Sequence, residues 1–234
     1  MSGLEMQNNE SGPMLERFPF FRTQPVYYAG MPVALDRKWW YKLLPKKRRN
    51  YKDLPAYEAA LISGLTKSAK AGSHVVVVGA GVGVTIAAAA KLVGSTGSVV
   101  CYEGSSQCID QATETLARNN LTGNVKLIHA IVGEDISVYK STQQAKILPA
   151  DKLPTCDILE LDCEGAEIKI LTEMSIRPNT ILVETHGSHG ATTQAVKELL
   201  GGLGYKVENL GVAEPYLTDY CKEHDIFVLK ADRS

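Results

Sequence analysis

The sequence lacks the cysteine and histidine patterns on which several classes of protein depend. Its five cysteines form no C-x-x-C pair, and this odd number argues against a disulfide framework or a zinc site. Free cysteines are typical of a reducing compartment, so we expect a cytoplasmic protein. The histidines and acids show no H-E-x-x-H or similar spacing, and no metal site is expected from the sequence.

Signals for export or membrane insertion are also missing. The first 14 residues contain neither a basic region nor an apolar one, so we expect no signal peptide. Residues 75–90 carry no charge, but 16 residues are too few to span a membrane comfortably, and three glycines interrupt them. A strand followed by a helix explains this segment better than a membrane span.

The chain has no overall excess of charge of one sign, because its formal net charge is −1. Basic residues are nevertheless concentrated in residues 36–52, where eight of them face a single acid; this local charge of +7 leaves −8 for the remainder. Trp39, Trp40 and Tyr41 lie in the same segment, a mixture that suits stacking and phosphate neutralisation. A solvated arm is the simpler interpretation, and we do not expect a nucleic-acid partner.

The most informative segment is a glycine-rich turn. Four valines, 75–78, lead into Gly79, Gly81 and Gly83, and an alanine-rich helical run follows. A buried strand that ends in a glycine turn at a helix N-terminus lets a ligand approach free backbone N–H groups. A dinucleotide fingerprint needs glycine at position 84, which is Val84; the G-x-G-x-G spacing is that of S-adenosylmethionine sites. A turn without a ligand is the alternative.

Strand and helix patterns alternate from residue 75 onward. This alternation predicts an α/β domain with a largely parallel sheet and helices on both faces. We divide the chain into an irregular arm, residues 1–53, and a domain, residues 54–234. The expected helices are 54–70, 84–93, 106–119, 165–174 and 191–202, and the expected strands are 75–78, 98–102, 124–131, 158–161, 180–184, 205–210 and 225–230.

Acidic residues follow the predicted strands at the edge where such sheets bind ligands. Glu103 ends the second strand, 22 residues past Gly81, where a carboxylate accepts hydrogen bonds from ribose hydroxyls. The alternative is a solvated loop acid. Asp162, Glu164 and Glu167 follow the fourth strand, and three acids that close repel one another unless a cation is present. For Glu167 we favour a plainer role at the start of the next helix.

Glu184 and His186 end the fifth strand. Residues two apart on an extended segment point to the same side. An imidazole with an ordinary pKa accepts a proton near neutral pH, which makes His186 a candidate base. A hydrogen-bonded pair at a strand end is an equal alternative.

These motifs, in this order, resemble the FkbM-type family of S-adenosylmethionine-dependent methyltransferases over roughly residues 54–231. Residues 161–167 resemble the family's I-D-x-E-G-x-E signature, and residues 183–186 are similar to its v-E-x-H. The resemblance implies a Rossmann-like class I methyltransferase fold, with a seven-stranded, mostly parallel sheet and an antiparallel last strand. The sequence departs from the family at Val77, where an acid is usual, at Gly81, where Asn is common, and at Glu160, where Lys is frequent.

The resemblance also implies a function, methyl transfer from S-adenosyl-L-methionine to an oxygen of a small-molecule, glycan or lipid-linked acceptor. It assigns cofactor binding to six residues and the proton transfer to three. A nucleic-acid methyltransferase that uses residues 36–52 and a catalytically silent S-adenosylmethionine-binding module are the alternatives. The implied cofactor residues are Gly79, Gly81, Gly83, Glu103, Ala130 and Asp162, and the candidate bases are His186, Glu164 and Glu184.

Overall fold

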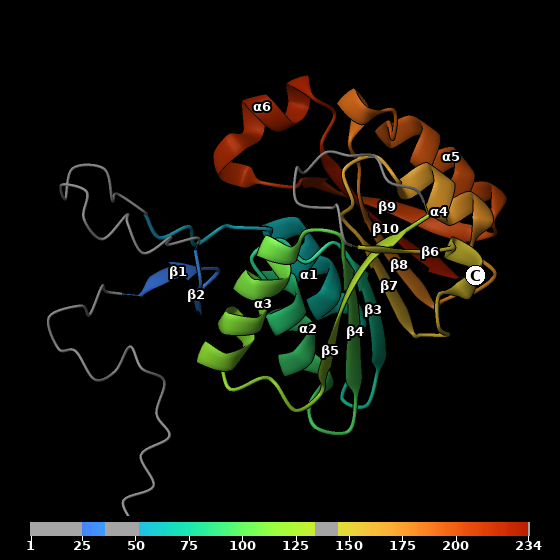
Figure 1. The fold of residues 1–234 in the computed structure, drawn as a ribbon. Helices are drawn as coiled ribbons and strands as arrows, with labels where there is room; N and C mark the ends of the chain where they lie inside the picture. The colour runs from blue at the N-terminus through green and yellow to red at the C-terminus, as the bar shows by residue number, and fades with distance from the viewer. Residues whose placement is uncertain (1–24, 36–51, 134–144, 234) are drawn as a thin grey trace, which may run out of the picture.

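The computed structural model describes residues 25–35, 52–133 and 145–233. Its main feature is an eight-stranded sheet with the order β6-β5-β4-β3-β7-β8-β10-β9 (Figure 1). Neighbouring strands from β6 to β8 are parallel, and β10 is antiparallel to both β8 and β9. The strands of this sheet are β3 (His74–Val78), β4 (Ser98–Glu103), β5 (Val125–Val132), β6 (Lys146–Leu148), β7 (Ile158–Leu161), β8 (Thr180–Glu184), β9 (Tyr205–Val212) and β10 (Phe227–Arg233).

The predicted fold class is confirmed, with one addition. The seven expected strands are present, and the antiparallel strand lies between β8 and β9. The eighth strand, β6, pairs with the edge strand β5. The sequence did not predict β6 because its three residues are too few to show a period of two.

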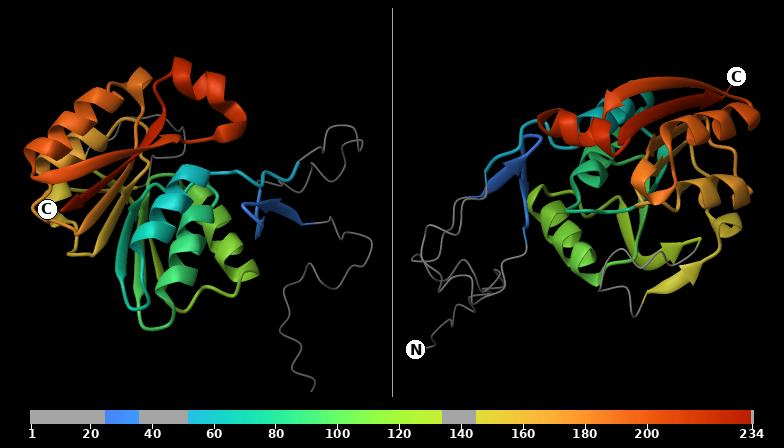
Figure 2. Two further views of the ribbon diagram at one scale, coloured as in Figure 1. Left: turned by 180° about the vertical axis from the view of Figure 1, so that it is seen from behind. Right: turned by 90° about the horizontal axis from the view of Figure 1, so that it is seen from above.

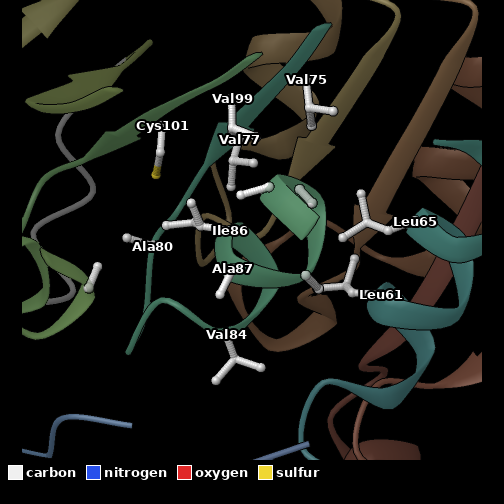
Figure 3. Packing of buried hydrophobic residues seen from close by; sticks show 14 of the residues in the cluster. Leu61, Leu65, Val75, Val77, Ala80, Val84, Ile86, Ala87, Val99 and Cys101 are labelled. Atoms are coloured by element: carbon white, nitrogen blue, oxygen red, sulfur yellow. The ribbon is translucent and has the colours of Figure 1, made fainter. Parts of the chain in front are cut away.

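Helices cover both faces of the sheet, as expected (Figure 2). The first three lie on one face, where α1 packs against α2 and β8; α4 and α5 lie together on the other. Alanine is the commonest residue of α2, and Figure 3 shows Ile86 and Ala87 of this helix within the core cluster. The helices are α1 (Ala59–Ser68), α2 (Val84–Val93), α3 (Ser106–Arg118), α4 (Glu167–Glu173), α5 (Thr193–Gly202) and α6 (Thr218–Glu223).

After His74, β3 consists of four buried valines. Val75 and Val77 lie with Leu61 and Ile86 in one core cluster (Figure 3). Val76 and Val78 lie in a second cluster, together with residues of α4 and α5. A central parallel strand is buried on both faces, so both of its sides are apolar. This packing fixes the end of β3, and with it the glycine turn.

The N-terminal part of the chain is more ordered than expected where the structure describes it. Residues 26–33 form a hairpin of β1 (Val26–Tyr28) and β2 (Met31–Val33). It is held to α3, because Arg118 donates to the carbonyl of Val33 at 2.9 Å and Asn119 to that of Pro32 at 3.1 Å. The basic segment 36–52 lies, except for Lys52, outside the described residues, and the division into arm and domain stays a prediction.

The helix expected at 54–70 is shorter than predicted. It begins at Ala59, because Glu58 adopts a left-handed conformation with φ of 48° that interrupts helical geometry. Among the described residues, no helix combines the length and the apolar character needed to cross a membrane.

Candidate functional site

The glycine turn is pressed against the end of β7. Gly79 has φ of 101°, and a Cβ built there would lie 1.8 Å from the carbonyl oxygen of Asp162. Its N–H donates to the carbonyl of Tyr102 at 2.9 Å, so the turn is tied to β4 as well. No side chain fits at this position, and the glycine is therefore required both for its φ and for the close approach.

The third glycine of the motif brings two helices together. Gly83 caps the N-terminus of α2 with φ of 89°, and a Cβ there would lie 2.8 Å from the Cα of Ala112 in α3. Gly81, with φ of 48°, has more space; the nearest atoms to a Cβ would be Glu58 Oε1 at 3.6 Å and Tyr57 Oη at 3.8 Å. The turn thus has free space at its middle glycine and none at the outer two.

Glu103 lies at the end of β4, beside the turn, as the sequence predicted. Its two carboxylate oxygens accept buried backbone N–H groups, that of Ala80 at 2.7 Å and that of Ser105 at 2.6 Å. Glu103 is only 8% exposed, so the alternative of a solvated loop acid is wrong. The side chain orders the glycine turn directly, a role that the sequence did not predict.

The acids after β7 and the Glu–His pair after β8 meet at one edge of the sheet. The two strands are parallel neighbours, with Leu161 opposite Val183. Their carboxyl ends therefore place Asp162 beside Glu184 and His186. The loops that follow also interlock, because a Cβ on Gly165 would lie 2.8 Å from the Cβ of His189.

His186 is the centre of this group. It is 6% exposed, and its Nδ1 lies 2.8 Å from Oε1 of Glu167, a hydrogen bond between two buried side chains. Its Nε2 faces three other carboxylates at longer range: Asp162 Oδ1 at 3.6 Å, Glu164 Oε2 at 3.7 Å and Glu184 Oε1 at 3.8 Å. One imidazole thus lies among four acids.

This surrounding charge changes the protonation of the ring. Burial by itself lowers the pKa of His186, but the hydrogen bond to Glu167 and the surrounding carboxylates outweigh it and raise the pKa to about 9. The free ring is therefore an imidazolium at neutral pH, which donates protons and does not accept them. The ordinary pKa on which we based His186 as a base does not hold here.

Two carboxyl groups of the site are harder to ionise than usual, whereas His186 is easier to protonate. Burial raises the pKa of Asp162 to about 6, although the charge of His186 acts against this shift. Burial and the charge of Asp162 also raise the pKa of Glu184 well above its usual range. Burial is the main cause of both shifts, and the neighbouring carboxylates add to it.

Glu167 is part of the site, which the sequence analysis did not predict. It does begin α4, but its side chain is fully buried and also accepts the N–H of Cys163 at 3.2 Å. Burial opposes its ionisation, yet the hydrogen bond to His186 holds the pKa of Glu167 below its ordinary value. The feature of the sequence that could have indicated this role is the Glu-Gly-Ala-Glu spacing of residues 164–167.

Two further acids beside the glycine turn were also missed. Glu58 is 8% exposed, and its N–H donates to Oε1 of Glu214 at 3.1 Å. Burial, together with neighbouring acids, raises the pKa of Glu58 well above its usual range, and burial raises that of Glu214 to about 7. No periodicity marks either residue, because Glu58 precedes a helix and Glu214 follows a strand.

Ala130 lies where the prediction places it, in β5 at the carboxyl end of the sheet. It is 5% exposed and follows His129, the residue paired with Glu103. Nε2 of His129 donates a hydrogen bond to the carbonyl of Gly104 at 3.0 Å. All nine predicted site residues therefore lie at one edge of the sheet.

Many solved structures share this fold, among them the following three. A precorrin-6y C5,15-methyltransferase from Geobacter metallireducens GS-15 is 17% identical, with a TM-score of 0.52 over 82% of this chain and 94% of its own. An S-adenosylmethionine-dependent O-methyltransferase from Thermotoga maritima is 18% identical, with a TM-score of 0.51 over 85% and 72%. A ribosomal protein L11 methylase from Lactobacillus delbrueckii subsp. bulgaricus is 12% identical, with a TM-score of 0.54 over 77% and 79%.

These likenesses, at identities below 20%, show that the fold is that of class I methyltransferases. No curated protein sequence matches the chain. The family profile of the methyltransferase FkbM domain, however, matches residues 78–207, more than half of the chain, from the end of β3 to β9. The chain therefore belongs to the FkbM methyltransferase family.

Proposed function

We propose that this protein transfers a methyl group from S-adenosylmethionine to an oxygen of a small-molecule or glycan-like acceptor. The observation that carries the proposal is the contact of Gly79 with Asp162, which brings the glycine turn and the acidic edge together. Family membership and the fold support the cofactor. The acceptor class rests on the sequence resemblance.

The cofactor is assigned to the glycine turn and its neighbours. Gly79, Gly81 and Gly83 would bind the methionine end, and the turn is open at Gly81. Although both oxygens of Glu103 hold backbone N–H groups, each carboxylate oxygen has a second acceptor site, which suits a ribose hydroxyl. Ala130 would flank the adenine. Asp162, about a quarter exposed at its side chain, would bind the amino group.

The acceptor would lie beyond the transferable methyl, against Glu164, Glu184 and His186. Methyl transfer from a sulfonium is an in-line displacement, for which the protein must align the oxygen and exclude water. An alcohol also loses its proton, so an acceptor group is required within about 3 Å. Because a free His186 is protonated at neutral pH, Glu164 and Glu184 precede it as proton acceptors.

The alternatives have less support. Phosphate backbones are repelled by the acids that surround this edge, which disfavours a nucleic-acid methyltransferase. The basic segment 36–52, on which that alternative depends, lies almost entirely outside the described residues. A silent cofactor-binding module differs from an enzyme only in turnover, which the experiments below measure.

Calorimetric titration tests the cofactor. We expect S-adenosylmethionine and S-adenosylhomocysteine to bind, and NADH not to bind, because position 84 is valine. Binding of NADH, with no binding of either sulfur compound, would make the assignment wrong.

The roles of two residues separate in the same assay. Asp162→Asn should raise the dissociation constant for S-adenosylmethionine, because the neutral amide loses its attraction for the amino group. His186→Ala should change this constant little but lower turnover, because it removes a side chain that lines the acceptor position; a loss of about 10²–10⁴-fold would identify His186 as the base in the cofactor-bound protein. Turnover is measured as S-adenosylhomocysteine released with acceptors fractionated from a lysate. If Asp162→Asn binds the cofactor as the wild type does and His186→Ala loses binding, the two residues have the opposite roles.

A further inference from the structure

Three side chains from neighbouring strand ends converge on one point. Asp162 follows β7, Glu184 ends β8, and His186 lies two residues after the end of β8. One ligand-type atom from each lies within 4.8 Å of the others. The Nε2-to-oxygen distances of 3.6 Å and 3.8 Å are close to those between ligand atoms that share an ion at about 2.0–2.2 Å.

The atoms that face this point lack hydrogen-bond partners. His186 is 94% buried, yet within the described ranges Nε2 has no oxygen or nitrogen at hydrogen-bonding distance. Glu184 is 91% buried, and no donor among the described side chains and backbone groups reaches its carboxylate. Polar side chains buried to this extent usually have hydrogen-bond partners, so the convergence of these two on one point favours a ligand there.

A second, independent observation concerns the far side of the imidazole. Glu167, which has no exposed surface, holds Nδ1 at 2.8 Å. Histidines that bind metals almost always donate this second N–H to a carboxylate or carbonyl, which fixes the tautomer and turns the other nitrogen toward the ion. The pair Glu167–His186 has this arrangement, with Nε2 directed at the carboxylates.

The chemistry of the donors limits the choice of ion. Two carboxylates and one imidazole suit Mn²⁺ or Zn²⁺, whereas Ca²⁺ prefers oxygen ligands alone. The side chains of Asp162 and Glu164 are 26% and 32% exposed, so the point is open on one side. A site of this kind keeps a coordination position for water or for a substrate oxygen.

We propose that Asp162, Glu184 and His186 bind one divalent cation of the Mn²⁺ or Zn²⁺ type, oriented by Glu167. No metal was expected from the sequence, because these ligands come from the ends of two strands and form no linear motif. Asp162 turns Oδ1 to this point, which leaves its second oxygen for the cofactor.

The catalytic consequence rests on the proposed function. The cation would bind the acceptor oxygen and lower the pKa of its hydroxyl. The O–H proton passes to Glu164 or to water, a new O–CH₃ bond forms, and the electrons of the S–CH₃ bond remain on sulfur. S-adenosylhomocysteine and the methyl ether are the products.

Metal binding is measured without the cofactor. We expect EDTA-treated, buffer-exchanged protein to bind one equivalent of MnCl₂, detected by calorimetry and by loss of the electron paramagnetic resonance signal of free Mn²⁺. ZnCl₂ should compete for this site and CaCl₂ should not. A wild-type protein that binds neither Mn²⁺ nor Zn²⁺ at a single site overturns the proposal.

Variants locate the site. His186→Gln and Glu184→Gln should each weaken Mn²⁺ binding at least 10-fold, and the positioning variant Glu167→Gln should weaken it about 10–100-fold. Glu208→Gln, an exposed acid paired with Lys67, should match the wild type. Wild-type affinity in both ligand variants, with folding confirmed by circular dichroism, overturns the proposal. S-adenosylmethionine binding measured in EDTA tests the proposed function separately.

Discussion

A Gly79→Ala variant is expected to lose at least about 4 kcal/mol of folding free energy, or to fail to fold. Two costs combine at this position. An alanine at φ of 101° is strained, and its Cβ would lie 1.8 Å from the carbonyl oxygen of Asp162, an atom of a central strand end that has no room to move. Urea denaturation measures the loss, and calorimetry should detect no S-adenosylmethionine binding.

Two other glycines provide matched controls. In Gly81→Ala the added Cβ has room, because its nearest neighbours would lie at 3.6 Å and 3.8 Å, and the only cost is backbone strain at φ of 48°. We expect a loss of about 1–2 kcal/mol of folding free energy. Gly201→Ala, in α5 with open space around it, should stabilise the protein by about 0.5–1 kcal/mol. Equal stabilities for the Gly79 and Gly81 variants would contradict the close packing of the turn on β7.

A Glu103→Ala variant should lose both stability and cofactor affinity. It leaves the N–H groups of Ala80 and Ser105 buried without acceptors, at about 1–3 kcal/mol each, so we expect a loss of about 2–6 kcal/mol in urea denaturation. The loosened turn and the unpaired ribose should weaken S-adenosylmethionine binding by about 1–3 kcal/mol, or roughly 5–150-fold.

The conservative variant separates charge from hydrogen bonding. Glu103→Gln keeps one acceptor oxygen but turns an NH₂ group toward the second backbone N–H, so its stability should lie between those of the wild type and Glu103→Ala. Asp110→Asn, an exposed acid on α3, removes the same charge and should change neither quantity. A Glu103→Ala protein with unchanged affinity would exclude Glu103 from the cofactor site.

The sequence predicted most of the fold because the sheet is buried on both faces. The bounds of β7 and β8 match the predicted ranges, since each strand is buried and mostly apolar and polar residues follow its apolar run. Short elements with no periodic signal, such as β6 and the hairpin of β1 and β2, were not predicted. The left-handed conformation of Glu58, which shortens α1, depends on contacts with Glu214 that are distant in sequence.

The site was predictable in position but less so in chemistry. Parallel strands bring their carboxyl ends together, and this was enough to group Asp162, Glu184 and His186. The protonation of His186 was not predictable, because it depends on which ring nitrogen faces Glu167 and on how closely the other acids approach. Both depend on where α4 begins, which the sequence leaves uncertain by about two residues.

The contact between Gly165 and His189 has a consequence for protein engineering. Because a Cβ on Gly165, in the loop after β7, would lie 2.8 Å from the Cβ of His189, in the loop after β8, a foreign first loop without this glycine would clash with the second. A chimera that aims at a new acceptor should transplant both loops as one cassette. A library in the loop after β7 should keep Gly165 or vary it together with His189.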